Sequence, residues 1–146
     1  MLIRPVTRSD GVEWARLREC LWPSGDHAAE IARFFDGVVL PTLGAAFVGM
    51  DDSGRPVGFA EASIRPYAEG CHSGRVAYLE GLFVEPHARR RGIGRALVAA
   101  VEAWGRAQRC TELGSDTDIA NDVSASAHRA LGFDEVERQI CFRKPL

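Results

Sequence analysis

The sequence predicts an α/β (α+β) fold in which helices flank a mixed, mostly antiparallel central sheet, within a single domain of residues 1–146. Strand-like and helix-like segments alternate in the order βααβββαβαβ, a pattern typical of a sheet covered by helices. The early strands are joined by a hairpin signal, which predicts antiparallel pairing. The length of 146 residues and the hydrophobic content of 46% suit one compact core.

The formal net charge of −2 gives no global basic field, so the composition argues against nucleic acid or a membrane surface as a partner. No apolar run approaches the ~20 residues of a membrane span, and the N-terminus has no signal-peptide pattern. We therefore expect a cytoplasmic protein. The cysteines are scattered without a CxxC pair, which predicts neither a disulfide framework nor a metal site; they are Cys20, Cys71, Cys110 and Cys141.

Residues 2–6 predict a short edge strand, because a proline is tolerated there. Ser9 or Asp10 can cap a helix that continues to residue 21, and Glu13 suits a capping box. Trp22-Pro23-Ser24-Gly25-Asp26 ends this helix. A second helix is predicted from about residue 28 to residue 35.

Residues 44–50 and 57–65 predict two strands, and the Asp51-Asp52-Ser53-Gly54-Arg55 turn between them indicates a hairpin. A long loop, residues 66–75, leads to a mostly buried strand at residues 78–84. The Glu85-Pro86-His87 segment ends that strand, because proline cannot donate to a ladder.

The next segment, Arg89-Arg90-Arg91-Gly92-Ile93-Gly94-Arg95, is a basic glycine loop that opens an amphipathic helix. Glycines at a helix start let the backbone approach a ligand, and the free N–H groups there suit a pyrophosphate. A merely solvated basic loop is the alternative for an isolated motif of this kind. The strand, proline break, arginines and helix occur together, which favours the anion site. A P-loop NTPase is disfavoured because no GK[ST] follows.

The last third of the chain continues the alternation. Residues 110–115 predict a buried strand that delivers Asp116 to its end, and Asn121 or Asp122 can cap a short helix to Ala130. Gly132 then ends that helix in the C′ position. Residues 137–143 predict the last strand.

These residues carry a family resemblance. The RRRGIG loop after a strand, with Asn121 and residues 128–133 downstream, resembles the GNAT acyl-CoA-dependent N-acetyltransferases. Within that superfamily the chain is most similar to the aminoglycoside 6′-N-acetyltransferases, through the segments LWP (21–23), GFAEASIR (58–65), YLEGLFV (78–84), SDT (115–117) and ALGF (130–133). The resemblance covers nearly the whole chain and implies that acetyl-CoA is the cosubstrate, an aminoglycoside the polycationic amine substrate, and a homodimer the assembly.

The resemblance also implies which residues bind. The backbone of the strand end would pair with the pantetheine arm, the glycine loop would hold the pyrophosphate, and Asn121 would lie near the sulfur; the cofactor set is Leu82, Phe83, Val84, Arg89, Arg90, Arg91, Gly92, Ile93, Gly94, Arg95 and Asn121. The residues that would line the aminoglycoside pocket are Trp22, Tyr67, Glu80, Asp116 and Glu137. Many family members carry a tyrosine that protonates the leaving thiolate; here His128 stands in that position and could take the role.

Direct acetyl transfer needs a neutral amine and a site for the oxyanion. An amine with a pKa of about 10.4 would cost roughly 4 to 5 kcal/mol to deprotonate at pH 7, so a nearby carboxylate base is useful. Glu80 is the first candidate and Asp116 the second. A bulge around Glu80-Gly81 would free a backbone N–H near Leu82 as the oxyanion donor.

Two other functions remain open on the sequence. One is a GNAT enzyme that acetylates another amine, such as a polyamine or a peptide N-terminus, which would keep the cofactor site and change only the substrate. The other is a non-catalytic module that binds acyl-CoA or a nucleotide. Turnover of acetyl-CoA with a panel of amines separates them.

Overall fold

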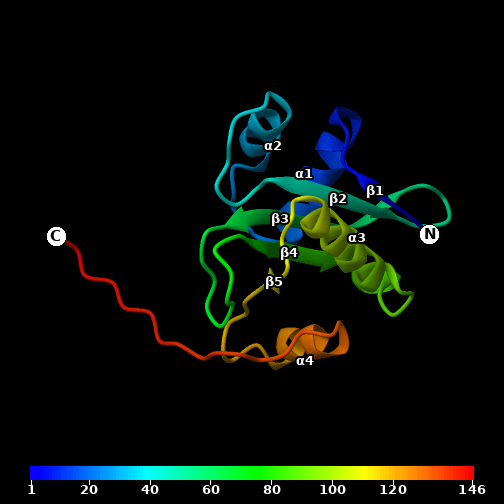
Figure 1. Cartoon of the computed structure of the whole chain (residues 1–146). Helices are drawn as coiled ribbons and strands as arrows, with labels where there is room; N and C mark the ends of the chain where they lie inside the picture. Colours follow the sequence, from blue (N-terminus) through cyan, green and yellow to red (C-terminus); the bar gives the residue numbers. More distant parts are fainter.

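The computed structural model describes residues 1–146, and a five-stranded sheet forms its centre (Figure 1). The strands are β1 (Leu2–Pro5), β2 (Ala45–Met50), β3 (Pro56–Arg65), β4 (Val76–Val84) and β5 (Leu113–Gly114), in that order across the sheet. The helices are α1 (Gly11–Leu21), α2 (His27–Phe35), α3 (Ile93–Ala107) and α4 (Asp122–Ala130), with two short 3₁₀ turns, η1 (Arg8–Asp10) and η2 (Pro86–Ala88).

The strands from β1 to β4 are antiparallel to their neighbours, and β5 runs parallel to β4. The predicted mixed, mostly antiparallel sheet is therefore confirmed. The β2–β3 hairpin turn is held by the Asp51 carboxylate, which accepts hydrogen bonds from the backbone N–H groups of Ser53 and Arg55. None of the helices combines the length and the hydrophobicity that a membrane-spanning helix needs.

Helices cover both faces of the sheet. The apolar side of α3, including Leu97 and Val101, packs on one face against side chains such as Val57. The opposite face carries α1 and α2, where Trp14 and Phe59 are completely buried. Because each face is covered, the middle strands are buried along most of their length.

Strand β4 carries a bulge where the sequence predicts one. Ala62 of β3 lies opposite Leu79, but its neighbour Glu61 lies opposite Gly81, so Glu80 has no partner on β3. An extra residue in one strand bends the strand and redirects its side chains. The bulge therefore changes which way Glu80 points relative to the regular alternation of β4.

The capping box predicted with Glu13 is not formed. The Asp10 carboxylate instead accepts hydrogen bonds from the backbone N–H and the hydroxyl of Thr7, one turn earlier, and so caps η1. Glu13 pairs with Arg16 on the surface of α1. The box therefore belongs to the short turn that precedes α1, and α1 has no side-chain cap.

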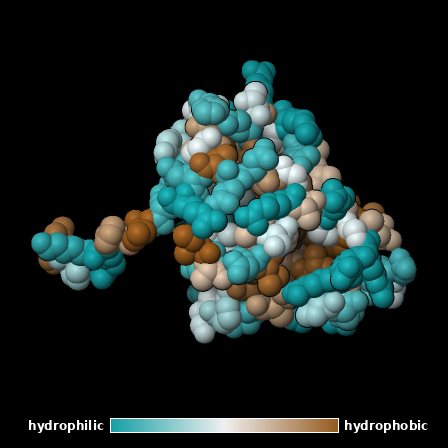
Figure 2. All heavy atoms as spheres, turned by 90° about the horizontal axis from the view of Figure 1, so that it is seen from below, coloured by the Kyte–Doolittle hydropathy of each residue, from teal (hydrophilic) through white to brown (hydrophobic).

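Two of the predicted strands also differ from those in the structure. The strand expected over residues 110–115 contains only Leu113 and Gly114. At its start the Cys110 N–H is still hydrogen-bonded to the Gly105 carbonyl of α3, and after its end the Ser115 hydroxyl contacts His128 of α4. The strand expected over residues 137–143 is absent: this segment is exposed and pairs with no strand. Figures 1 and 2 show the C-terminal tail standing away from the body, where no neighbouring strand of the same chain can satisfy its backbone.

Candidate functional site

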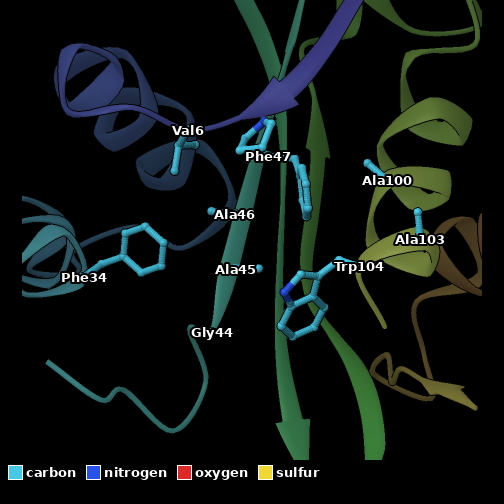
Figure 3. Close-up of a pocket in the computed structure, with 10 residues that line it drawn as sticks. Val6, Phe34, Gly44, Ala45, Ala46, Phe47, Ala100, Ala103 and Trp104 are labelled. Atoms are coloured by element: carbon cyan, nitrogen blue, oxygen red, sulfur yellow. The ribbon is translucent and has the colours of Figure 1, made fainter. Parts of the chain in front are cut away.

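Two hollows of the structure differ sharply in character. One, of about 470 Å³, lies between α2, β2 and α3 and is lined only by apolar residues and glycine (Figure 3). The other, the acidic cavity, has about 960 Å³ and lies around β5, α4 and the start of the tail. Its lining includes three arginines and eight carboxylates, namely Glu69, Glu102, Glu112, Asp116, Asp118, Asp134, Glu135 and Glu137. Only the acidic cavity can attract a polycation.

Strand β4, whose Tyr78 lines the acidic cavity, has a free backbone edge beyond that residue. Strand β5 pairs with β4 only at Ala77 and Tyr78, so no strand covers that edge of β4 from Leu79 to Val84. Unpaired N–H and C=O groups of such an edge can bind an extended chain. Leu82, Phe83 and Val84, predicted to bind the pantetheine arm, are half-buried on this edge. A group with alternating amides, as in pantetheine, fits it.

The glycine loop ends at the start of α3, as predicted. Gly92 is the N-cap residue with φ of 84°, and no side chain caps the helix. The first intrahelical bond is donated by Ala96, so the N–H groups of Ile93, Gly94 and Arg95 have no partner within the helix. A Cβ on Gly92 would meet no heavy atom within 4 Å, which leaves open space for a phosphate.

The loop arginines divide into two pairs. Arg89 donates to the carbonyl of Val84 and lies over the Phe83 ring, and Arg95 donates to the carbonyl of Ala130. Arg90 and Arg91 are exposed. The first pair therefore fixes the shape of the loop, and the second pair can meet an anion.

A polar network connects the two predicted acids. Glu80 accepts hydrogen bonds from the Ser63 hydroxyl at 2.6 Å and from Arg65 at 2.9 Å and 2.8 Å. The Arg65 guanidinium carbon lies 3.6 Å from the centre of the Tyr78 ring, and the Tyr78 hydroxyl donates to Asp116. Burial and this hydrogen bond raise the pKa of Tyr78 far above its usual value, so it remains a donor. The structure thus links Glu80 and Asp116 through Arg65 and Tyr78.

His128 lies at the wall of the acidic cavity. Its Nε2 is 2.8 Å from the Ser115 hydroxyl, and its Nδ1 is 2.8 Å from the backbone carbonyl of Ser124. A carbonyl can only accept, so Nδ1 carries a proton and the Nε2 of a neutral ring accepts from Ser115. Asn121 caps α4, its side-chain oxygen accepting from the Ser124 N–H at 3.0 Å. Its amide NH₂ makes no hydrogen bond and is left for a ligand.

The other residues predicted to line the aminoglycoside pocket do not all lie in one place. Trp22 lies directly on Gly81, next to Glu80, and Glu137 lines the acidic cavity with Asp116. Tyr67 is 65% exposed in the loop after β3 and does not line the cavity.

Sequence reasoning missed the residues that connect this site. Arg65 was predicted only as the last residue of the strand at 57–65. Tyr78 was predicted only as the first residue of the strand at 78–84. The period-two alternation of β3 places Arg65 on the same face as Ser63, which could have suggested a partner for Glu80. No local pattern in the sequence indicates the contact between Ser115 and His128.

Comparison with known proteins agrees with this geometry. The acetyltransferase (GNAT) family model matches residues 12–133. The chain is 51% identical to an aminoglycoside N(6′)-acetyltransferase type 1 of Klebsiella aerogenes, over 99% of this chain and 97% of the relative. It is 44% identical to the protein of the same name from Salmonella typhimurium strain LT2, over 99% of each chain.

Solved structures give the same result. AAC(6′)-Iy in complex with the bisubstrate analogue CoA-S-monomethyl-acetylneamine superposes with a TM-score of 0.88 at 42% identity, over 99% of this chain and 98% of that chain. AAC(6′)-Ih from Acinetobacter baumannii gives a TM-score of 0.88 at 35% identity, with the same coverage. The chain therefore belongs to the GNAT acetyltransferase family, among the aminoglycoside N(6′)-acetyltransferases type 1.

Proposed function

We propose that this protein transfers the acetyl group of acetyl-CoA to the 6′-amino group of an aminoglycoside, by direct attack of the amine in a ternary complex. The observation that carries the proposal is the combination of a free β4 edge, an open helix N-terminus and an acidic cavity whose wall includes Arg65, the partner of Glu80 in the β4 bulge. The full-length similarity to aminoglycoside N(6′)-acetyltransferases supports the same reaction.

The cofactor half of the site is assigned to β4 and the glycine loop. The backbone of residues 82–84 pairs with the pantetheine amides, and the N–H groups at the start of α3, with Arg90 and Arg91, hold the pyrophosphate. Arg89, Gly92 and Arg95 shape this loop. Asn121 is assigned to the region of the sulfur through its free amide NH₂. Solved structures of a relative with CoA support acetyl-CoA as the cosubstrate.

The substrate half of the site is assigned to the bulge and the acidic cavity. Trp22 and Tyr67 supply aromatic surface, and Asp116 and Glu137 supply negative charge for the ammonium groups of the substrate. Glu80 receives the proton of the attacking amine, directly or through water, because Arg65 and Ser63 keep its oxygens directed to one place. The backbone N–H of Leu82, beside the bulge, donates to the oxyanion.

The departing thiolate needs a proton, and His128 is the candidate donor. A neutral His128 accepts from Ser115 at Nε2, so only the protonated ring can give a proton at that atom. The proton would pass through the Ser115 hydroxyl or directly from Nε2.

The deciding experiment supplies acetyl-CoA with a panel of amines and measures the released thiol. Aminoglycosides with a 6′ amine should be acetylated, whereas analogues with a 6′ hydroxyl should bind without reacting. Mass spectrometry should place one acetyl group on the 6′ nitrogen. Expression in a sensitive bacterium should then raise resistance to those drugs. Preference for a polyamine or a peptide N-terminus would support the alternative enzyme, and absence of turnover with every amine would support a binding module.

We also propose that two copies exchange their tails to form a homodimer. The tail, residues 134–146, exposes Ile140 at 80% and Phe142 at 91%, and the outer edge of β5 is unpaired. A tail strand from a second copy would satisfy that edge and bury these side chains. Sedimentation should give a dimer for the wild type and a monomer for Phe142→Glu. A monomeric wild type at micromolar concentration would contradict the exchange.

A further inference from the structure

A buried charged cluster lies next to the proposed amine site and has no part in the reaction described above. Glu61 of β3 is 1% exposed and Arg18 of α1 is 5% exposed. Glu61 accepts from Trp14 Nε1 at 2.9 Å and pairs with Arg18 Nε at 2.8 Å. Arg18 also pairs with Glu30 of α2, at the rim. Helices α1 and α2 are thus tied to the middle of the sheet by charge as well as by packing.

Such a pair is poorly explained by stability alone. Burial raises the pKa of Glu61 to about 7, against the opposing effects of Arg18 and Trp14, which reflects how costly the charge is in this place. Buried ion pairs can often be replaced by uncharged residues of similar volume without loss of stability. The contacts that Arg18 makes beyond Glu61 indicate a role other than holding the fold.

Arg18 contacts Trp22. Its guanidinium carbon lies 5.2 Å from the centre of the Trp22 ring and 6.0 Å from the centre of the Trp14 ring. Its Nη1 is buried and has no hydrogen-bond acceptor. The negative face of an indole ring attracts a cation, so these contacts partly replace the missing acceptor. The position of Trp22 is therefore coupled to the buried charge.

Trp22 is held on its other sides by the sheet. Its ring lies on the backbone of Gly81, where a Cβ would overlap it, and packs edge to face on Phe59 at 5.8 Å. Gly81 is the residue opposite Glu61 and follows Glu80 in the bulge. The indole thus rests between the buried cation and the backbone of the bulge.

We infer that Arg18 and Glu61 are positioning residues that hold the Trp22 indole against the β4 bulge and so shape the aminoglycoside wall of the site. The inference rests on the proposed function and deepens it. Glu61 orients the guanidinium, the guanidinium binds the indole, and the indole meets the substrate. Glu61 and Glu30 also balance the charge of Arg18, which would otherwise repel a polycationic substrate.

The test compares Glu61→Gln, Arg18→Met and the double variant. Each single change leaves a buried charge without its partner, so it should lower the urea concentration at the midpoint of unfolding. The double variant buries no charge, and the amide oxygen introduced at position 61 still accepts from Trp14, so stability should return. The guanidinium is still missing, so the aminoglycoside KM should stay raised about tenfold in Arg18→Met and in the double variant. The acetyl-CoA KM should not change.

A spectroscopic measurement makes the test independent of activity. With 5-fluorotryptophan incorporated, the fluorine resonance of Trp22, assigned by Trp22→Phe, should shift or broaden in the double variant while that of Trp104 does not. Arg4→Met is the matched control, because it breaks another ion pair of a buried carboxylate, Asp10, far from the bulge. It should lower stability without changing either KM or the Trp22 resonance.

Two results overturn the inference. One is a double variant with the wild-type aminoglycoside KM; the other is an unchanged Trp22 resonance in that variant. Failure of the proposed function itself is recognised separately, because the wild type would then consume no acetyl-CoA with any aminoglycoside. The fluorine spectra would in that case still decide whether Arg18 positions Trp22.

Discussion

Replacing Gly92 with alanine tests the cofactor assignment with a single methyl group. Gly92 has φ of 84° at the start of α3, and an added Cβ would meet nothing within 4 Å. The substitution therefore adds backbone strain of about 1–2 kcal/mol and no clash. For a chain of this size each kcal/mol lowers Tm by roughly 2–4 °C, so the variant should remain folded.

Gly54 provides the matched control. It has φ of 82° in the β2–β3 turn, and its Cβ would also meet nothing within 4 Å. Gly54→Ala and Gly92→Ala should therefore lose the same stability in urea titrations. Only Gly92→Ala places a methyl group where the phosphates would approach the backbone, and it should raise the acetyl-CoA KM about tenfold, equivalent to about 1.4 kcal/mol. The aminoglycoside KM should not change.

The assay is steady-state release of free thiol, with each substrate varied at saturating levels of the other. Gly92→Val should raise the acetyl-CoA KM further than Gly92→Ala. Wild-type acetyl-CoA KM values in both folded Gly92 variants would refute the assignment. Equal KM increases in Gly54→Ala and Gly92→Ala would show that strain, and not ligand approach, is the cause.

Three further predictions concern the site and the core. Glu80→Gln should lower kcat and move the lower limb of the pH profile to higher pH, whereas Asp116→Asn should mainly raise the aminoglycoside KM; wild-type constants in both variants at every pH would contradict these roles. No cysteine is expected to be a nucleophile, so initial rates should show a ternary complex and Cys110→Ala should stay active; ping-pong kinetics would contradict direct transfer. Hydrogen bonding to Arg4 lowers the pKa of Asp10 from 3.8 to about 2, so its contribution is present above pH 3.8 and lost as pH falls towards 2; urea midpoints of wild type and Asp10→Asn should converge in that window, and a constant difference would argue against it.

Features that depend on near neighbours in the chain were predictable. The glycine N-cap at Gly92, the Asn121 cap and the C′ glycine at Gly132 follow from local backbone preferences, and the structure has all three. The β4 bulge was also predicted, from the place where the chemistry needs a free backbone N–H. The three cap predictions need only a few residues on either side to be made.

Features that depend on distant partners were not predictable. Arg18 and Glu61 are 43 positions apart, and nothing in either segment indicates that they pair in the core. Residues 137–143 have the composition of a strand. A strand also needs a neighbouring strand to pair with, and composition does not identify that neighbour. The same holds for the shortened β5, which pairs with β4 at only two residues.

The tail has two roles in the structure, and their combination has a thermodynamic consequence. Residues 134–139 and Cys141 line the acidic cavity, while the chain beyond them leaves the body. If the chain beyond them crosses to a second copy, the contact between the two copies also holds the cavity wall in place, including Glu137. Substrate affinity and self-association are then linked, and linkage is reciprocal. Dilution would weaken aminoglycoside binding, and the drug would in turn draw two copies together at concentrations where they otherwise separate.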